Sequence, residues 1–481
     1  MVCRPWIIRC RFAEMDFRKI ETVYFLGIGG IGMSALARYF KSQGKFVMGY
    51  DRTSTALTTE LQMEGIDVHF DDNTLEIPHI VRLGDKEKIL VVYTPAMPKD
   101  SPELNWLNEN GYTILKRSQV LGLITQHTKT IAIAGTHGKT TTSSLVAHIL
   151  MDSGIGCNAF LGGITSNYNS NLLLSPTSEW TVVEADEYDR SFLTLSPTIS
   201  AITSMDADHL DIYGSLDYMH ESFNLFARKL SADGTLYYKS GLPVITDGVS
   251  FSWKEYSIEK NAEFKGENIR IENSSYYFDL VINEKIELSK HNNELKNMEL
   301  GLPGRHNVEN AVVACAIALQ VGVTPAQLRK ALANFKGVKR RFEYRIKTHD
   351  LVLIDDYAHH PEELRACISS VKELYPAAKI TGVFQPHLFS RTRDFADEFA
   401  RSLELLDEII LLPIYPAREQ PIPGIDSQML LDNISKTSKI LLEKSELLAE
   451  LKRNSRQIIL MLGAGDIDAL VPLVAEAFGQ P

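Results

Sequence analysis

Short apolar runs alternate with helix-like segments along most of this chain. In the first third these runs are Thr22–Leu26, Phe46–Tyr50 and Ile89–Tyr93, and helix-like segments lie between them. Strands that alternate with helices are typical of α/β folds with mostly parallel sheets. The pattern therefore predicts an α/β protein.

The alternation is interrupted once. From Leu236 to about Leu302 the chain shows short alternating strands with turn residues, which predicts a small β subregion. Apolar runs and helices then resume up to Leu462. We therefore expect three domains in the 481 residues: an α/β domain at 1–118, a central domain with the β subregion at 119–335, and a third domain with a mostly parallel sheet at 336–481.

Composition narrows the functional classes. A net charge of −11 argues against a nucleic-acid-binding surface. No apolar run is long enough to cross a membrane, and residues 1–14 lack the features of a signal peptide. The five cysteines have no CxxC spacing, so neither a disulfide framework nor a zinc site is expected. We expect a cytoplasmic protein with no membrane insertion and no nucleic-acid partner. Residues 1–14 are either a disordered extension or an artefact of an upstream start.

The segment richest in chemistry follows the apolar run Ile131–Ala134. It reads Gly135-Thr-His-Gly-Lys-Thr-Thr141 and leads into a helix-like pattern, as a P-loop does. Backbone N–H groups of such a loop face an anion, Lys139 can reach the β- and γ-phosphates, and the Thr140 hydroxyl can ligate Mg²⁺. Ile133 stands where the full Walker pattern has its first glycine, but the lysine and threonines favour a nucleotide site over a plain turn.

Two later apolar runs end in acidic side chains. The first ends in Glu184-Ala-Asp-Glu187, which is the Walker-B arrangement that binds Mg²⁺ directly or through water. The second ends in Asp206-Ala-Asp-His-Leu-Asp211. We expect these two strands to lie side by side, with His209 as a metal or substrate contact. The alternatives are a hydrogen-bonded structural histidine and acids that cap strand ends in solvent.

A glycine turn follows the first strand. Gly27, Gly29 and Gly32 match GxGxxG, and the second strand ends at Asp51, which is placed for a ribose hydroxyl. Taken alone, this spacing leaves open a nicotinamide-dependent oxidoreductase, another diphosphate-binding protein, and a glycine turn without a ligand. Thr94 follows a further strand, where open α/β sheets bind ligands.

Polar residues of the last third also follow predicted strands, which puts them on one rim of a sheet. They are Asp355, Tyr357, His359, His360, His387, Arg391 and Arg393. The basic turn Lys339-Arg-Arg-Phe342 is either a phosphate contact or a solvated charge run. Asn307 begins an Ala- and Val-rich helix and is either a base or phosphate contact or simply an N-cap.

Together these segments resemble the Mur ligases of peptidoglycan synthesis. The motifs that carry the resemblance occur in order over nearly the whole chain, and the ordered set is far more specific than any one of them. They are Gly27-Ile-Gly-Gly-Ile-Gly-Met33, Gly135-Thr-His-Gly-Lys-Thr-Thr141, Glu184-Ala-Asp-Glu187, Asp206-Ala-Asp-His-Leu-Asp211, Gly304-Arg-His-Asn-Val308, Asp355-Asp-Tyr-Ala-His-His-Pro361, Phe384-Gln-Pro-His387, Arg391-Thr-Arg-Asp394 and Tyr415-Pro-Ala417. His137 and the first glycine loop favour the alanine-adding branch of the family.

The resemblance implies three domains in order along the chain: a Rossmann-like domain that binds a UDP-sugar, a central P-loop domain that binds ATP, and a second Rossmann-like domain that binds an amino acid. The implied reaction is ATP-dependent ligation of L-alanine to the lactyl carboxylate of UDP-N-acetylmuramate through an acyl phosphate. Lys139, Glu184 and His209 would be catalytic. Thr140, Glu184 and His209 would hold one or two Mg²⁺ ions, for which Mn²⁺ can substitute.

The resemblance also implies the remaining contacts. Those to ATP are Gly135, Thr136, His137, Gly138, Lys139, Thr140, Thr141, Asn307, Arg341 and Asp355. Those to the UDP-sugar are Gly27, Gly29, Gly30, Ile31, Gly32, Asp51 and Thr94. Those to the amino acid are Tyr357, His359, His387 and Arg391.

Three alternatives and one departure accompany this interpretation. The nearest alternative is the recycling ligase that adds a peptide to the same UDP-sugar, and the first glycine loop argues against it. The second is the nicotinamide-dependent oxidoreductase, which leaves the P-loop and both acidic strand ends unexplained, and the third is a nucleotide sensor without catalytic activity. Leu388 stands where many family members carry arginine, so selectivity for the amino acid is less firmly implied than the reaction. We expect a monomer or a weak dimer.

Overall fold

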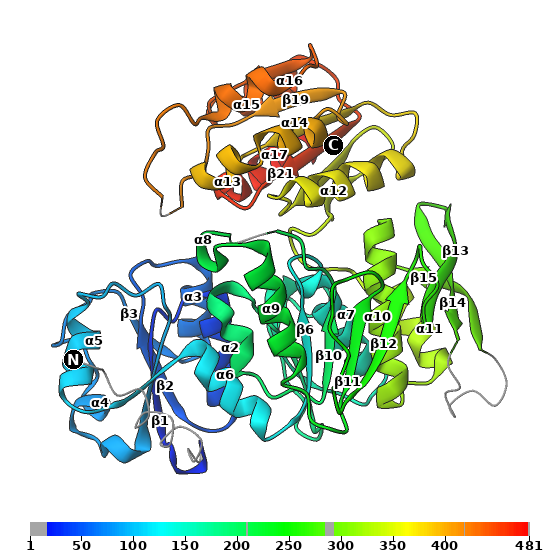
Figure 1. Cartoon of the computed structure of the whole chain (residues 1–481). Coiled ribbons are helices and arrows are strands. Elements are labelled where there is room, and N and C mark those ends of the chain that lie inside the picture. The colour runs from blue at the N-terminus through cyan, green and yellow to red at the C-terminus, as the bar shows by residue number, and fades with distance from the viewer. Residues whose placement is uncertain (1–16, 208–209, 284–292, 418, 480–481) are drawn as a thin grey trace. The chain divides into compact units, whose positions relative to one another are not determined.

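The structure is a computed structural model that describes residues 17–207, 210–283, 293–417 and 419–479 (Figure 1). The chain divides into two compact units. Unit 1 contains the residues up to Ile164, Tyr168–Phe264 and Val313–Leu328; unit 2 contains Thr165–Asn167, Lys265–Val312 and the chain from Arg329 onward. The strands form three sheets, one for each predicted α/β domain. The domain boundaries near residues 118 and 335 stay predictions.

The first sheet lies in unit 1 and is parallel throughout, in the order β3-β2-β1-β4-β5. Its strands are β1 (Thr22–Leu26), β2 (Phe46–Tyr50), β3 (Asp67–His69), β4 (Ile89–Tyr93) and β5 (Thr113–Lys116). The central strand β1 is buried along its whole length. That burial explains why its sequence is a continuous apolar run and not an alternating one.

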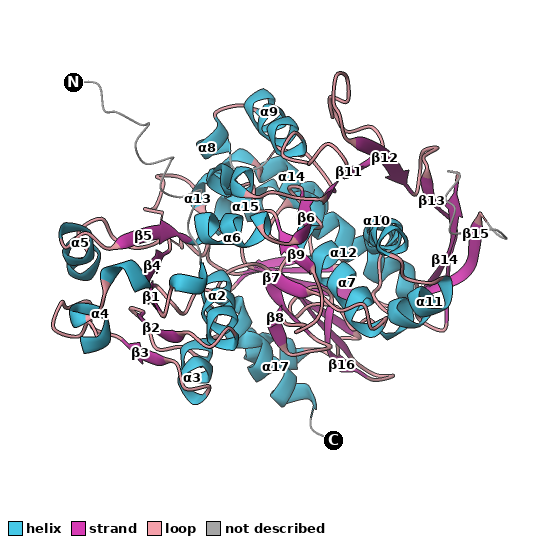
Figure 2. Cartoon of the chain, turned by 90° about the horizontal axis from the view of Figure 1, so that it is seen from below, coloured by secondary structure: helices cyan, strands magenta, loops and turns pink. Residues whose placement is uncertain are grey.

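Helices cover both faces of this sheet (Figure 2). Val23 and Phe25 of β1 point into one core, and Tyr24 and Leu26 point into another, because successive side chains of a strand alternate between faces. The helices concerned are α2 (Ile31–Ser42) on the first face and α4 (His79–Leu83) and α5 (Pro102–Glu109) on the second. The GxGxxG turn joins β1 to α2, as the sequence predicts.

The second sheet places the P-loop strand in its interior. Within unit 1 its order is β12-β11-β10-β6-β9-β7-β8, and the pairs from β12 to β7 are parallel. The strands are β6 (Lys129–Ala134), β7 (Asn158–Thr165), β8 (Ser170–Leu173), β9 (Trp180–Glu184), β10 (Ile199–Ile202), β11 (Thr235–Lys239) and β12 (Ser252–Ser257). The carboxyl ends of β9 and β10 therefore lie on either side of the P-loop.

The predicted β subregion from Leu236 to Leu302 is smaller than expected. Its first two strands, β11 and β12, continue the parallel sheet from β10. Leu236 and Tyr237 are both fully buried, so the two faces of β11 are covered as parallel strands require. The antiparallel pairing lies in unit 2, where β14 (Ser275–Ile282) pairs with β15 (Glu294–Leu300), and β13 (Phe264–Glu272) precedes these two strands in the chain.

The third sheet lies in unit 2, in the order β16-β17-β21-β18-β19-β20. Only the edge strand β16 is antiparallel to its neighbour. The strands are β16 (Glu343–Lys347), β17 (Val352–Asp356), β18 (Ile380–Phe384), β19 (Glu408–Leu411), β20 (Lys439–Leu441) and β21 (Ile458–Leu462). The polar segments after β17 and β18 leave the same edge of the sheet because the strands are parallel.

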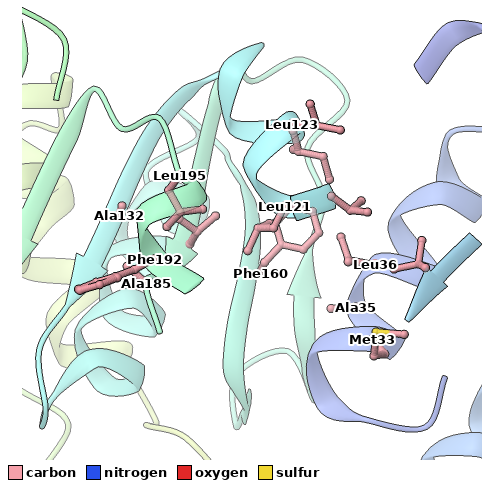
Figure 3. Packing of buried hydrophobic residues seen from close by; sticks show 14 of the residues in the cluster. Met33, Ala35, Leu36, Leu121, Leu123, Ala132, Phe160, Ala185, Phe192 and Leu195 are labelled. Atoms are coloured by element: carbon pink, nitrogen blue, oxygen red, sulfur yellow. The ribbon is translucent and has the colours of Figure 1, made fainter. Parts of the chain in front are cut away.

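One apolar core runs through unit 1 from the first sheet to the second (Figure 3). Met33 and Leu36 of α2, Leu121 of α6 (Arg117–Gln126) and Phe160 of β7 belong to it. The rings of Tyr39 and Phe160 add an edge-to-face contact with centroids 5.3 Å apart. The helix that follows the first glycine loop is therefore packed directly against the P-loop sheet.

Two structural findings concern the membrane-crossing segments and the cysteines that the sequence analysis considered. No helix in the described part of the chain combines the length and apolar character that a membrane crossing needs. Cys157, Cys315 and Cys367 are buried and free of disulfides. Cys3, Cys10 and the expected disordered extension at residues 1–14 lie outside the described residues.

The core predicts a large cost for truncating Phe192. Its ring is 1 % exposed, stacks on Phe226 with centroids 5.0 Å apart and meets Phe223 edge-on at 5.4 Å. Phe192→Ala should lower the free energy of unfolding by about 3–5 kcal/mol, because it leaves a cavity in a close-packed core. Urea unfolding followed by circular dichroism measures this. The control is Phe46→Ala, whose ring is 63 % exposed; an equal loss in both variants would contradict the core assignment.

Candidate active site

The P-loop connects β6 to α7 (Lys139–Asp152) through four residues. Gly138 is the N-cap of α7 and has a φ of 81°, in the left-handed region that favours glycine. Gly138 has no side chain that could cap the first turn of α7. The backbone N–H groups of this turn therefore present the partial positive charge that binds phosphate at a helix N-terminus.

Lys139 is held inside the loop by two kinds of oxygen. Its Nζ donates to the Gly135 carbonyl oxygen at 2.6 Å and lies 2.9 and 2.8 Å from the two carboxylate oxygens of Glu187. Burial lowers the pKa of Lys139, but the carboxylates of Glu187, Glu184 and Asp186 outweigh burial and raise it above its ordinary value. The ammonium group is therefore charged at neutral pH.

The opposite flank of the P-loop is fastened to the segment after β10. Ser204 Oγ accepts a hydrogen bond from the His137 backbone N–H at 2.7 Å and lies 2.9 Å from Thr136 Oγ1. Thr136 Oγ1 also accepts from the Asp206 N–H at 3.1 Å. These bonds order the loop before a ligand arrives, which lowers the entropy that binding would cost.

Glu184 stands at the end of β9 beside Gly162 of β7. The Gly162 N–H donates to Glu184 Oε2 at 3.0 Å. A β-carbon on residue 162 would lie 2.3 Å from the same oxygen, so only glycine allows β7 to approach the carboxylate this closely. The backbone of the neighbouring strand thus positions the Glu184 carboxylate.

The strand order corrects one expectation. β9 and β10 are not neighbours, because β6 lies between them. The sequence pattern finds the strands but carries no information on their order, and doubly wound sheets often place the first strand of a unit in the interior. Glu184 and Ser204 consequently flank the P-loop from opposite sides. His209, predicted to meet Glu184, lies outside the described residues.

A cavity of about 330 Å³ adjoins Glu184. Gly30–Gly32 and Thr94 of the first sheet line it on one side, and Glu184 and Asp186 line it on the other. Four of the residues predicted to contact a UDP-sugar therefore share one cavity with a residue predicted to bind metal. The sequence motifs predict the two sites separately and do not predict their distance.

The other predicted UDP-sugar residues support the glycine loop. The Gly29 N–H donates to Asp51 Oδ2 at 2.7 Å, and the Gly27 N–H donates to the Tyr50 carbonyl oxygen at 2.8 Å. The second carboxylate oxygen of Asp51 accepts from the Thr53 N–H at 3.1 Å. Asp51 thus orders the turn in addition to its predicted contact with a ribose.

Arg117 lies between the glycine loop and the acidic strand end. A β-carbon on Gly32 would lie 2.7 Å from Arg117 Nη1, and Arg117 Nη2 lies 3.6 Å from Asp186 Oδ2. Arg117 is the only lysine or arginine among the described residues that line the cavity. A guanidinium in this place suits the oxygens of a phosphate or a carboxylate.

Unit 2 gathers the predicted amino-acid residues after β17 and β18. The guanidinium groups of Arg340 and Arg341 each lie 5.1 Å from the ring centroid of Tyr357. The Tyr357 ring meets the His359 ring with centroids 5.2 Å apart, and the His359 ring meets His387 at 5.8 Å. The side chains of Tyr357, His359 and His387 therefore form one cluster. Arg391 belongs to this cluster because its charge acts on His387.

Burial lowers the pKa of His387 to about 4, and the charges of His359 and Arg391 act in the same direction. The imidazole is therefore neutral near pH 7. Leu388, the departure noted in the sequence, has a φ of 71°, which is unusual for a residue with a branched side chain. Its N–H donates to the Tyr415 carbonyl oxygen at 3.0 Å, which holds the strained turn at the cluster.

Two predicted nucleotide contacts of unit 2 are buried. Burial raises the pKa of Asp355 to about 6, and its Oδ2 lies 3.6 Å from Arg340 Nε. Asn307 is the third residue of α10 (Arg305–Val321), and its Nδ2 donates to the Pro303 carbonyl oxygen. The alternative that Asn307 is an N-cap is therefore wrong, because the side chain donates to a carbonyl and lies inside the helix.

Comparison with known proteins shows which family this sequence matches. Three family models match in succession: the Mur ligase family catalytic domain at residues 22–129, the Mur ligase middle domain at 133–318, and the Mur ligase glutamate ligase domain at 340–467. The chain belongs to the Mur ligase family. Its three-domain α/β fold and its nature as an ATP-dependent ligase, both predicted from sequence, are thereby confirmed.

Individual Mur ligases resemble this one over nearly its full length. The UDP-N-acetylmuramate–L-alanine ligase of Parabacteroides distasonis is 50% identical over 465 residues, which are 96% of this chain and 98% of that protein. The protein of the same name from Christiangramia forsetii is 49% identical over 462 residues, with coverage of 96% and 98%. The solved UDP-N-acetylmuramate–alanine ligase of Thermotoga maritima is 27% identical, with a TM-score of 0.78 and coverage of 95% and 99%.

The residues of this Mur ligase fit a magnesium ion that is shared with a phosphate. No three His, Cys, Asp or Glu side chains of the described residues form a metal cluster by themselves. Mg²⁺ is commonly held by one or two carboxylates together with substrate phosphates, not by an all-protein cage. Glu184, positioned by Gly162, and the Thr140 hydroxyl at the start of α7 provide such oxygens.

Several residues of this Mur ligase have roles that the sequence alone did not assign. They are Glu187, Ser204, Gly162 and Arg117. Glu187 was visible in the acidic run, but only the structure pairs it with Lys139. Gly162 interrupts a strand, which is a signal for close backbone approach. Ser204 and Arg117 follow strand ends, but their targets come from distant segments, so no local pattern identifies them.

The contact between Gly162 and Glu184 yields a prediction. Gly162→Ala should lower the turnover number of this Mur ligase about 100-fold, because the added methyl group displaces the Glu184 carboxylate by roughly 1 Å. Steady-state phosphate release measures this. The control is Gly479→Ala, where a β-carbon would have only ordinary contacts at 3.6 Å. Full activity of a folded Gly162→Ala variant would contradict the proposed position of Glu184.

Proposed function

We propose that this Mur ligase joins L-alanine to the lactyl carboxylate of UDP-N-acetylmuramate and cleaves ATP to ADP and phosphate. The proposal draws on the relatives of that name, which share about half of its residues. The observation that carries it is the cavity that Gly30–Gly32 share with Glu184. In that cavity a UDP-sugar bound at the glycine loop has its acidic end beside the phosphoryl-transfer site.

The reaction needs no protein nucleophile. A lactyl carboxylate oxygen attacks the γ-phosphorus of ATP, and the bond from the γ-phosphorus to the bridging oxygen of ADP breaks. The alanine amine then attacks the acyl carbon, and phosphate leaves with the oxygen that came from the carboxylate. Catalysis therefore rests on positioning and on stabilisation of negative charge.

Lys139 supplies a fixed positive charge to this chemistry. Its ammonium group is buried in the P-loop and stays protonated because of the surrounding carboxylates. Phosphate oxygens bound in the loop would share the ammonium group with Glu187. A bound Mg²⁺, held by Thr140, Glu184 and His209, would supply further neutralisation of the phosphate and carboxylate oxygens.

Arg117 is a candidate anchor for the acidic substrate. It is the cation of a cavity that otherwise contains two carboxylates, Glu184 and Asp186. An anion at the glycine loop can replace Asp186 as the partner of Arg117, because their present separation of 3.6 Å is that of a loose ion pair. We assign Arg117 to the diphosphate or the lactyl carboxylate of the UDP-sugar.

The cluster in unit 2 suits a small amino acid. Arg391 is 8 % exposed and can pair with the alanine carboxylate in a bidentate manner. His387 stays neutral, so it adds no positive charge that would repel the alanine ammonium group. Tyr357 and His359 complete the predicted walls. The nucleotide contacts assigned to Asn307, Arg341 and Asp355 are part of the same proposal.

The function is tested by phosphate release with UDP-N-acetylmuramate and ATP across a panel of amino acids. We expect the highest kcat/KM with L-alanine and lower values with glycine and L-serine. Faster release with the tripeptide L-alanyl-γ-D-glutamyl-meso-diaminopimelate would replace the proposal with the recycling activity. Absence of release with every acceptor would point to a nucleotide-binding protein without ligase activity.

The Lys139→Ala variant tests whether ATP and UDP-N-acetylmuramate use separate sites. Loss of the ammonium group should lower the turnover number about 100- to 1000-fold, the range for removing one group that stabilises transition-state charge. UDP-N-acetylmuramate should bind with unchanged affinity by calorimetry, because Lys139 is not among the residues that line its cavity. The control is Lys129→Ala, at the exposed start of β6, the strand that leads into the P-loop. Loss of both activity and sugar binding in a folded Lys139→Ala variant would contradict this division.

A further inference from the structure

Three polar side chains meet inside the first sheet, on the face away from the active-site cavity. Tyr24 comes from β1, His69 ends β3, and Glu103 lies in the first turn of α5. The Tyr24 hydroxyl contacts Glu103 Oε2 and lies 2.8 Å from His69 Nε2. His69 Nε2 lies 3.5 Å from Glu103 Oε1, and the Glu103 side chain is fully buried. None of the chemistry described above uses these groups.

The hydrogen-bond geometry requires one extra proton among the three side chains. His69 Nδ1 lies 3.1 Å from the Asp71 carbonyl oxygen, which can only accept, so Nδ1 carries a proton. The Tyr24 hydroxyl has one proton for two contacts. If it donates to a neutral His69, Glu103 must be protonated and donate to Tyr24. If it donates to a Glu103 carboxylate, His69 must carry a second proton.

The surroundings favour Glu103 as the holder of this proton. Burial raises the pKa of Glu103 to about 7 and lowers the pKa of His69. Burial also raises the pKa of Tyr24 well above its ordinary value, so the phenol does not ionise. The titratable groups that face the three side chains from the neighbouring elements are Asp67, Asp71, Asp72, Glu76 and Tyr50. The four carboxylates among these groups oppose a negative charge on Glu103.

The cluster connects to the glycine loop through two further bonds. The Asp51 backbone N–H donates to the His69 carbonyl oxygen at 3.0 Å. The Asp51 side chain in turn accepts from the Gly29 N–H at 2.7 Å. On the other side, Asp72 Oδ1 accepts from the Glu103 N–H at 3.1 Å, which ties the start of α5 to the segment after β3. The position of His69 is therefore transmitted to the loop that lines the cavity.

We propose that Glu103, Tyr24 and His69 share one proton and that Glu103 is a positioning residue, which acts through Tyr24 and His69 to hold Asp51 and the glycine loop in the form that binds the UDP-sugar. When the proton leaves, the Tyr24 oxygen and His69 Nε2 face each other at 2.8 Å with no hydrogen between them. The resulting repulsion displaces His69 and the edge of the sheet that it carries. The link to the UDP-sugar rests on the proposed function, whereas the shared proton does not.

The binding test is calorimetry of UDP-N-acetylmuramate with the full chain, without ATP or alanine, from pH 6 to pH 8.5. The dissociation constant of the natural protein should rise about fivefold as pH passes about 7, the equivalent of one lost hydrogen bond. Glu103→Gln should bind tightly at every pH, because its amide donates to Tyr24 without a titratable proton. The matched control is Glu109→Gln, an exposed position on the same helix, which should keep the pH dependence of the natural protein.

Tyr24→Phe is the second variant and serves if Glu103→Gln does not fold. Loss of the hydroxyl uncouples His69 from Glu103, so binding should be weaker at every pH and should no longer change near pH 7. A flat pH profile in the natural protein, or an unchanged profile in either variant, would overturn the positioning role.

A stability measurement distinguishes failure of this inference from failure of the proposed function. Because the folded-state pKa of Glu103 is raised from 4.5 to about 7, the folded state holds a proton that the unfolded state has lost between these values. Stability should therefore fall as pH rises through this window. The urea midpoint of Glu103→Gln relative to the natural protein should rise from pH 5 to pH 8. A constant difference would refute the shared proton, whatever the protein binds.

Discussion

The ion pair between Lys139 and Glu187 is the contact on which the position of the P-loop depends. It joins the P-loop to the segment after a neighbouring strand, and both side chains are largely removed from water. Removing one partner of a buried pair typically costs about 3–5 kcal/mol, because the other charge is left without compensation. The pair therefore exists only if β9 lies beside β6, and the sheet order provides that neighbour. On the other flank, Ser204 anchors the same loop through neutral hydrogen bonds.

The apolar core of unit 1 extends this constraint to the first sheet and its glycine loop. Met33 and Leu36 of α2 pack in one cluster with Phe160 of β7. This packing holds the glycine loop before α2 close to β7, the strand whose Gly162 positions Glu184. Asn171 of β8 adds a hydrogen bond to the Ile31 carbonyl oxygen. The cavity is thus a product of packing between two sheets, and its charged residues are placed by elements far apart in the sequence.

The strands, the two glycine loops and the ordered motifs were predictable because each depends on local pattern: apolar runs for buried strands, and glycine before a lysine for a P-loop. Spatial order was not. The expectation that β10 adjoins β9 was wrong, and β11 and β12 belong to the parallel sheet and not to the β subregion. Glu187, Gly162 and Arg117 acquire their roles from partners 22 to 69 positions away, which no periodicity encodes. The assignment of His209 remains a prediction.

In the proposed reaction the cavity brings a substrate carboxylate to the γ-phosphate, so that one oxygen passes from the carboxylate to phosphorus. The most direct test uses UDP-N-acetylmuramate labelled with ¹⁸O in the lactyl carboxylate, together with ATP and L-alanine. Each released phosphate should carry one carboxylate oxygen, visible by mass spectrometry or by the ³¹P isotope shift. Release of unlabelled phosphate during amide formation would contradict it, because the carboxylate would then not have attacked phosphorus.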